Sequence, residues 1–216
     1  MIISPGRKFI FVHIPKTGGT SMALALEARA HKDDILIGDT PKARRRKARA
    51  KTLNAKGRVW KHSTLADIHG ALSEEDLRGM FVFTLVRNPW DRMVSYYHWL
   101  QDQSFDHPAV SLAKKTDFDG FVRAPQTAQS FKSNPYRSYV TDGNGAERAN
   151  AFVRLEALEE DLAPITEHLG FPLDIPHVNR SQRPSDYRLA YSDATVEAVA
   201  SMCAEDISRF GYVFSA

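Results

Sequence analysis

A short apolar run followed by a glycine-rich loop constrains the fold of this chain more than any other feature of its sequence. Residues 8–14 read Lys-Phe-Ile-Phe-Val-His-Ile, which is typical of a buried strand. The loop from Pro15 to Ser21 follows, and residues 20–29 are rich in helix formers with an apolar stripe. This part of the chain therefore predicts a strand, a glycine loop and a helix in direct succession.

Similar strand and helix signals recur farther along the chain. Residues 80–86 predict a second strongly buried strand, and Pro89 suits the first turn of the helix after it. Residues 151–155 predict a late strand, with a helix over 158–169 behind it. Strands that alternate with helices favour the α/β class, here a three-layer fold with a mainly parallel central sheet and flanking helices.

The remaining segments carry weaker signals. Residues 59–62 predict a short strand, and Ser73, which three acidic residues follow, predicts a helix start. Residues 195–210 predict a C-terminal amphipathic helix that Ser192 or Asp193 would begin. Residues 124–145 are rich in Pro, Ser, Asn and Gly and predict irregular surface. Because 216 residues suit one full core and no linker stands out, we predict a single domain over residues 1–216.

Composition limits the compartment in which the chain would work. No apolar run approaches the ~20 residues that a membrane span needs. Arg7 and Lys8 interrupt the N-terminal segment where a signal peptide would have its apolar core. A single cysteine, Cys203, excludes an internal disulfide, so we expect a reducing, cytoplasmic setting.

Positive charge is concentrated in one segment. Ten of the 29 Lys and Arg residues lie between Lys42 and Lys61 with no acid among them, and the rest of the chain has 19 cations against 26 anions. The segment is either a solvated surface or an attractor for an anionic donor or acceptor. Residues 42–51 contain no aromatic side chain that could stack on a base, which argues against nucleic acid as the partner.

The loop after the first strand has the chemistry of a phosphate site. Gly18 and Gly19 tolerate positive φ, so consecutive N–H groups can turn inward at a helix start, where the dipole favours an anion. Lys16 adds a full positive charge. Further hydroxyl donors come from Thr17, Thr20 and Ser21. An ordinary strand-to-helix turn with a surface lysine is the plainer alternative.

The order of residues in this loop bears on the nucleotide. In the Walker A pattern the lysine follows the glycines and directly precedes Ser or Thr, whereas Lys16 stands before Gly18 and Gly19. The loop therefore disfavours a kinase or NTPase that uses Mg-ATP.

A second candidate phosphate site follows the strand at residues 80–86. In an open parallel sheet, ligands bind at the carboxyl edge of the strands, and Arg87 stands there with a planar guanidinium suited to phosphate. Ser95 lies two helical turns into the next element and can donate a hydroxyl to the same group. For Arg92, an ion pair with Asp91 or a neighbouring acid is as well supported as a ligand contact.

The strings Phe11–Ser21 and Leu85–Tyr97 together resemble the sulfotransferase family that includes the carbohydrate 2-O-sulfotransferases. Enzymes of this family use 3′-phosphoadenosine-5′-phosphosulfate (PAPS) and have a P-loop-like fold. The resemblance implies that Arg87 and Ser95 bind the 3′-phosphate, and a weaker similarity near the C-terminus adds Asn179 or Ser181. It implies that the 5′-phosphosulfate is held by Lys16, Thr17, Gly18, Gly19, Thr20 and Ser21. ATP has no 3′-phosphate, so the pair of motifs favours PAPS.

The catalytic residues are also taken from this resemblance. The string Lys-His-Ser-Thr-Leu at residues 61–65 is similar to the segment that carries the family's catalytic base, which makes His62 the candidate base. A structural histidine that caps a strand is the alternative reading of His62, and His13 reads as an ordinary buried histidine. Lys16 would contact the bridging oxygen and stabilise the leaving phosphate. No metal-ligand spacing stands out, so no metal is expected, and Cys203 reads as a core residue.

The sequence thus predicts a PAPS-dependent sulfotransferase that acts on a hydroxyl-bearing acceptor, either a carbohydrate or a small metabolite. The acceptor would be anionic if the basic segment binds it. The animal carbohydrate enzymes have an N-terminal membrane anchor, whereas this chain begins almost at its first strand, so the glycan acceptor is not carried over. A P-loop-like kinase and a non-catalytic polyanion-binding protein are the alternatives.

Overall fold

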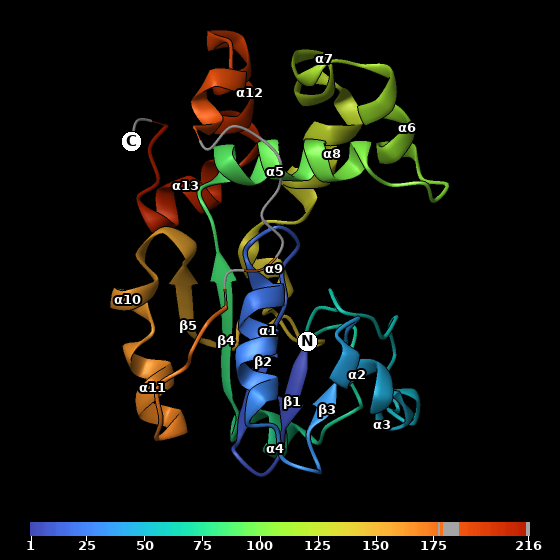
Figure 1. Cartoon of the computed structure of the whole chain (residues 1–216), viewed down its shortest axis with the longest axis vertical. Coiled ribbons are helices and arrows are strands. Elements are labelled where there is room, and N and C mark those ends of the chain that lie inside the picture. Colours follow the sequence, from blue (N-terminus) through green and yellow to red (C-terminus); the bar gives the residue numbers. More distant parts are fainter. Residues whose placement is uncertain (177, 179–185, 215–216) are drawn as a thin grey trace. The chain divides into compact units, whose positions relative to one another are not determined.

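The computed structural model describes residues 1–176, 178 and 186–214, and it divides the chain into two compact units (Figure 1). Unit 1 comprises residues 1–86 and 136–178, and unit 2 comprises residues 87–135 and 179–216. Each unit has a hydrophobic cluster of its own. The prediction that residues 1–216 form a single domain stays a prediction.

Unit 1 is built on a mixed five-stranded sheet in the order β3-β1-β2-β4-β5. Its strands are β1 (Ile2–Ser4), β2 (Phe9–Val12), β3 (Ile35–Leu36), β4 (Phe81–Val86) and β5 (Ala149–Arg154). Strands β2, β4 and β5 run parallel, whereas β1 pairs antiparallel with both β2 and β3. The sheet is therefore less parallel than the sequence predicts, because a tight turn after β1 returns the chain directly into β2.

Strong local signals placed the central elements of unit 1 correctly. On one face of the sheet, Phe9 and Phe11 of β2 and Phe83 of β4 belong to the same buried cluster as Met22 of α1 (Gly19–Ala28) and Ile165 of α11 (Ala163–Leu169). Alternate residues of the same strands, such as Ile10 and Val82, are also fully buried. Burial on both faces explains why β2 and β4 read as continuous apolar runs.

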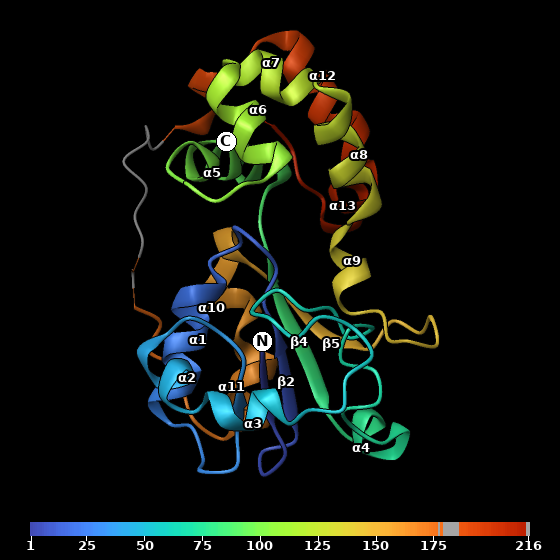
Figure 2. The same ribbon diagram turned by 90° about the vertical axis from the view of Figure 1, so that its right-hand side faces the viewer.

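The other helical segments of unit 1 are mostly short (Figures 1 and 2). They are α2 (Pro41–Arg45), α3 (Lys47–Lys51), α4 (Glu74–Arg78), α9 (Tyr136–Tyr139), η1 (Leu155–Ala157) and α10 (Leu158–Asp161). Ser73 caps α4 as predicted, because its hydroxyl accepts a hydrogen bond from Asp76 N at 3.0 Å. The helix predicted over 158–169 is divided into α10 and α11, with Pro164 in the first turn of α11.

The described part of unit 2 consists of helices. They are α5 (Pro89–Gln101), α6 (Pro108–Lys115), α7 (Phe118–Arg123), α8 (Pro125–Ser133), η2 (Tyr187–Ala190), α12 (Asp193–Met202) and α13 (Ala204–Phe210). Trp90, Met93 and Tyr97 of α5 belong to one buried cluster with Phe121 of α7 and Val199 of α12. An amphipathic α5 thus provides the centre of this core.

Two predictions in the helical segments were wrong. Residues 124–145 are not all irregular, since they contain α8 and α9: Pro125 occupies the first turn of α8, and Phe131 is buried. The C-terminal helix is two helices, α12 and α13, that meet at Cys203. Its predicted start is confirmed, because Ser192 forms a capping box with Thr195.

No helix within the described residues combines the length and the apolar character that crossing a bilayer requires.

Candidate active site

The loop between β2 and α1 has the backbone conformation of an anion site. Lys16 and Gly18 have positive φ values of 67° and 84°, and Gly18 is the N-cap of α1. No side chain caps the first turn of α1, all of which is described, and the N–H of Ser21 donates to the Gly18 carbonyl at 3.1 Å. The N–H groups of Gly19 and Thr20 precede the first helical hydrogen bonds and can serve an anion. Left-handed residues in such a turn direct backbone N–H groups into a concave surface that suits phosphate.

Thr17 holds this loop to the end of β2. Its side chain is fully buried, and its hydroxyl donates to the carbonyl of Ile14 at 3.0 Å. The Thr17 hydroxyl therefore donates its proton within the loop, whereas the sequence predicts that this hydroxyl donates to the ligand. Thr20 and Ser21, in the first turn of α1, are only partly buried.

Gly19 is required by the histidine that precedes the loop. A Cβ at Gly19 would lie 2.1 Å from Cδ2 and 2.5 Å from Nε2 of His13. The imidazole of His13, which is 8% exposed, therefore packs directly on the backbone at the start of α1. Gly18 is also constrained, because a Cβ there would lie 2.8 Å from Leu155 Cδ1.

His62 is tied to the same segment through His13. The Nδ1 atom of His62 lies 2.8 Å from the carbonyl oxygen of His13, and the two rings meet edge to face with centroids 4.6 Å apart. A carbonyl oxygen accepts but cannot donate, so Nδ1 of His62 carries the proton. In neutral His62 the Nε2 atom therefore keeps its lone pair, which is the state that a general base requires.

The segment that carries His62 is not the strand that the sequence predicts. Residues 57–71 form turns, bends and irregular backbone without a strand, and Ser63 binds backbone groups that a strand would present to its neighbours. The Ser63 hydroxyl donates to the Arg58 carbonyl at 2.7 Å and accepts from Trp60 N at 2.9 Å. Farther along, Leu65 N donates to Tyr139 O at 2.9 Å. His62 is thus positioned by a compact, internally bonded loop.

Burial keeps both histidines neutral. It lowers the pKa of His62 from 6.5 to about 4, although the hydrogen bond to the His13 carbonyl acts in the opposite direction. Burial likewise lowers the pKa of His13 well below its usual value. Near neutral pH, His62 can therefore accept a proton.

An exposed aromatic side chain stands beside His62. Trp60 is 38% exposed, and its ring meets that of His62 edge to face with centroids 5.0 Å apart. The guanidinium carbon of Arg58 lies 4.7 Å from the centroid of the Trp60 ring. The surroundings of His62 thus combine an aromatic ring with a cation.

The second motif lies in unit 2, at the start of α5. Arg87 pairs with Asp91 one turn later: its Nε donates to Asp91 Oδ2 at 2.9 Å. Ser95 is buried, with 6% of its surface exposed. Asn88 caps α5 by accepting from Trp90 N at 3.1 Å, and Pro89 follows in the first turn as predicted.

Asp91 therefore pairs with a different arginine from the one considered in the sequence. The guanidinium carbon of Arg92 lies 5.2 Å from the ring centroid of Phe131, and Arg92 is 6% exposed. Sequence reasoning missed the pair of Arg87 with Asp91, although their spacing of four residues on a helix is a known signal for it.

The predicted site residues thus belong to three groups. The loop Lys16–Ser21 and His62 lie in unit 1, where His13 links them. Arg87 and Ser95 lie in unit 2. Asn179 and Ser181 fall outside the described residues. No spacing in the sequence signals the contact of His13 with His62, because 49 residues separate them.

Several cations of the basic segment are used within unit 1. Lys42 Nζ donates to the Glu27 carbonyl, Arg46 Nη1 donates to the His31 carbonyl at 2.6 Å, and Arg49 Nη1 donates to the Lys32 carbonyl. These cations pair with carbonyl oxygens in and after the last turn of α1, where the helix dipole favours positive charge. Other cations of the segment, including Arg44, Arg45, Lys47 and Lys51, are exposed.

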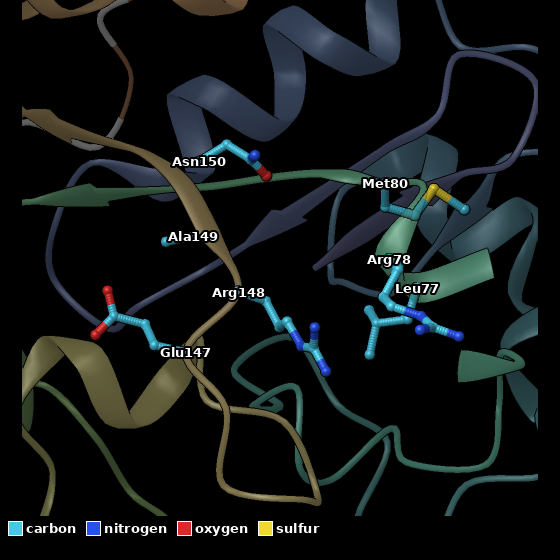
Figure 3. A pocket seen from close by; sticks show the side chains of 7 residues that line it. All are labelled: Leu77, Arg78, Met80, Glu147, Arg148, Ala149 and Asn150. Carbon is cyan, nitrogen blue, oxygen red and sulfur yellow. The ribbon is translucent and has the colours of Figure 1, made fainter. Parts of the chain in front are cut away.

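A cavity of about 270 Å³ lies near the amino ends of β4 and β5, at the end of the sheet opposite the glycine loop (Figure 3). It is lined by Leu77, Arg78, Met80, Glu147, Arg148, Ala149 and Asn150. Met80 precedes β4 and Ala149 begins β5, so the cavity adjoins the amino ends of these strands. The glycine loop follows the carboxyl end of β2, and none of the predicted site residues lines the cavity.

Cys203 behaves as the core residue that was expected. It is buried, and burial raises the pKa of its thiol to about 12. The thiolate needed for nucleophilic attack is therefore disfavoured.

Comparison with known proteins identifies the family and the fold of the chain. The profile of the sulfotransferase family matches residues 1–215, and the chain therefore belongs to this family. Among solved structures, it is similar to the mouse sulfotransferase SULT7A1 complexed with PAP: identity is 14%, TM-score is 0.53, and the match covers 95% of this chain and 86% of that one. That likeness shows the sulfotransferase fold. No curated protein matches the sequence.

Proposed function

We propose that this chain transfers the sulfuryl group of PAPS to a hydroxyl-bearing acceptor, with His62 as the general base. The observation that carries the proposal is the hydrogen bond from His62 Nδ1 to the His13 carbonyl. It assigns the lone pair to Nε2, and the same His13 packs its ring against Gly19 at the start of α1. One residue thereby supports both the base and the anion loop.

The 5′-phosphosulfate end of the donor fits the loop of unit 1. Positive φ at Lys16 and Gly18, together with the uncapped first turn of α1, provides backbone N–H donors for an anion. Lys16 adds the charge that would neutralise the leaving phosphate, while Thr20 and Ser21 supply hydroxyl donors. The Thr17 hydroxyl stabilises the loop, so its contribution to the donor would come from its backbone.

The 3′-phosphate would be bound by Arg87 and Ser95 of unit 2. Arg87 already binds an oxyanion, the Asp91 carboxylate, with its Nε–H at 2.9 Å. A phosphate would share or replace this carboxylate, because a planar guanidinium binds both groups through the same N–H donors. Ser181 would add a further hydroxyl.

In the transfer step, His62 Nε2 accepts the proton of the acceptor hydroxyl while that oxygen forms a bond to sulfur. The bond between sulfur and the bridging oxygen breaks in line, and its electron pair leaves with the 5′-phosphate of PAP. Lys16 and the loop N–H groups stabilise the charge that develops on this leaving group. His62 then releases the proton to solvent, and the sulfate ester and PAP are the products.

Donor binding would make His62 a stronger base. In the ligand-free chain burial lowers the pKa of His62 to about 4, which favours the neutral form. An anionic donor beside the imidazole favours the charged form and therefore raises this pKa toward the range in which proton transfer is efficient.

No metal ion takes part in the proposed transfer step. The proposed setting is reducing and cytoplasmic. Lys16 and the backbone N–H groups supply the positive charge at the loop, and the single cysteine suits a reducing compartment. The acceptor would be a carbohydrate or a small metabolite. Exposed cations such as Arg44 and Arg45 would favour an anionic one.

The decisive experiment compares PAP with 5′-AMP by thermal shift, at equal concentrations and without metal ions. PAP should raise Tm by several degrees and 5′-AMP by much less, because Arg87 and Ser95 would bind the 3′-phosphate. Equal shifts would remove the 3′-phosphate site from the proposal. A shift with Mg-ATP but none with PAP would favour the kinase instead.

A further inference from the structure

Three side chains of metal-ligating type converge in the connection between α1 and β3. They are His31, Asp33 and Asp34, and one ligand atom from each lies within 4.8 Å of the other two. This connection follows the C-terminal end of α1, whereas the glycine loop precedes its N-terminal end. The cluster is therefore separate from the candidate active site.

Asp34 is an unusual member of this cluster because it is buried. Its residue surface is 2% exposed, and its Oδ2 accepts from His31 N at 2.8 Å. Its Oδ1 has no hydrogen-bond partner; within the part of the chain that the structure describes, the one other buried side-chain atom in this condition is Ser4 Oγ. A buried carboxylate oxygen without a partner costs free energy, and a bound cation would remove that cost.

A glycine provides the space beside the other two side chains. A Cβ at Gly6, in the turn between β1 and β2, would lie 3.1 Å from His31 Nδ1 and 3.4 Å from Asp33 Oδ2. Both atoms therefore face the bare backbone of this turn. Figures 1 and 2 show the turn between β1 and β2 at the same end of unit 1 as the connection from α1 to β3.

We propose that His31, Asp33 and Asp34 bind one divalent transition-metal ion of the zinc type. A set of one imidazole nitrogen and two carboxylate oxygens binds Zn²⁺ in preference to Mg²⁺ or Ca²⁺, because the latter two ions take oxygen ligands. In a tetrahedral zinc site the ligand atoms stand roughly 3.3–3.5 Å apart. The two exposed side chains, His31 and Asp33, can rotate to close the present separation, and water would complete the coordination.

The role of this ion would be structural. It would fix the conformation of the connection between α1 and β3, which supplies all three ligands. The cations Arg46 and Arg49 already bind carbonyl oxygens of His31 and Lys32 in the same connection. The site takes no part in the proposed transfer step, so it can be tested independently of that step.

Arg7 offers a way to tune the site. Its Nη1 atom lies 3.9 Å from Asp34 Oδ2, beyond hydrogen-bond distance, and its guanidinium carbon also lies 5.4 Å from the ring centroid of Phe171. A positive charge here repels a metal ion. The variant Arg7→Gln should therefore bind Zn²⁺ more tightly than the wild type.

The test is titration of the tag-free, chelator-treated full chain with ZnCl₂, with MnCl₂, MgCl₂ and CaCl₂ as parallel arms. Calorimetry should show one Zn²⁺ site, and Zn²⁺ at a hundredfold excess over its Kd should raise Tm by roughly 5–10 °C. His31→Ala and Asp33→Asn should each weaken binding by at least about tenfold. Asp106→Asn, which removes an exposed acid elsewhere, should not change it.

Three results would overturn the proposal. They are the absence of a Zn²⁺-dependent shift in the wild type, an affinity that is unchanged in both His31→Ala and Asp33→Asn, and tighter binding of Mg²⁺ or Ca²⁺ than of Zn²⁺. PAP binding is measured in the same variants. If the wild type did not bind PAP, the proposed function would be contradicted and the zinc result would stand.

Discussion

The two candidate phosphate sites of this chain rest on different kinds of atoms. The loop before α1 offers backbone N–H groups, and Lys16 and Gly18 have left-handed φ values there. The His13 ring packs against Gly19 and leaves no room for a side chain at that position. The start of α5 offers side chains, with Arg87 already paired to Asp91 and Ser95 buried in the helix. The first site is thus set by steric packing, whereas the second depends on charge and on an exchange of partners.

The largest effect should come from His62, the proposed general base. His62→Ala removes the proton acceptor, so we expect turnover to fall by about 10²- to 10⁴-fold while PAP affinity stays within a few fold. Transfer of a labelled sulfuryl group to an acceptor, or to water if a screen yields none, measures the first quantity and calorimetry the second. Unchanged turnover would assign the base to another residue.

Steric packing at the loop predicts the next effect. Gly19→Ala places a Cβ within 2.5 Å of the His13 ring, so we expect a loss of roughly 3 kcal/mol in the free energy of unfolding. His13 must shift, and its link to His62 shifts with it, so PAP binding and turnover should also decrease. Gly38→Ala is the matched control, because its Cβ would meet its nearest neighbour at 3.9 Å. Equal stability of the two variants would contradict the packing described here.

Acidification should destabilise unit 1 through the same histidines. In the unfolded chain His62 binds a proton below about pH 6.5, whereas in the folded chain it does so only near pH 4. Stability is therefore independent of this group above pH 6.5 and falls as the pH decreases toward 4, by on the order of 2–3 kcal/mol. Denaturant unfolding at pH 8 and pH 5 measures the change, and His62→Gln should make it smaller. A variant with the same pH dependence as the wild type would show that burial of His62 does not cause it.

The smallest effect should come from the charge-based site. Arg87→Ala should weaken the binding of PAP by about 10- to 100-fold and leave the binding of 5′-AMP almost unchanged, because it removes the side chain proposed to bind the 3′-phosphate. Asp91→Asn frees the guanidinium from its carboxylate and should strengthen PAP binding by a few fold. Arg123→Ala is the control, since Arg123 forms an exposed pair with Asp119 at the same helical spacing. If Arg87→Ala weakened PAP and 5′-AMP equally, the arginine would not bind the 3′-phosphate.

Local signals allowed the sequence to predict the parts of the fold in which neighbouring residues determine the structure. The apolar runs of β2 and β4, the caps at Ser73 and Ser192 and the proline at the start of α5 were predicted correctly. The two-residue strand β3 is too short to carry a pattern. The strand predicted at residues 59–62 was wrong, because Ser63 binds the backbone groups that a strand would have used.

The site was predictable to a similar degree. The position of the loop that contains Lys16, Gly18 and Gly19 could be predicted because these residues are close in the sequence and stand between a strand and a helix. The connection of His13 with His62 could not, since it joins residues far apart in the sequence through a carbonyl oxygen that every residue type possesses. The reason for Gly19 was equally hidden, because only the structure shows which ring lies against it.

The left-handed backbone of Lys16 has a consequence for efforts to make this protein more robust. A lysine in this conformation costs about 1 kcal/mol or more relative to glycine, so a search for stabilising substitutions would favour glycine at this position. That exchange would remove the only charged side chain of the loop. With Lys16 stabilising the leaving phosphate as proposed, heat resistance and turnover make opposite demands on residue 16, and a variant selected for the first would lose part of the second.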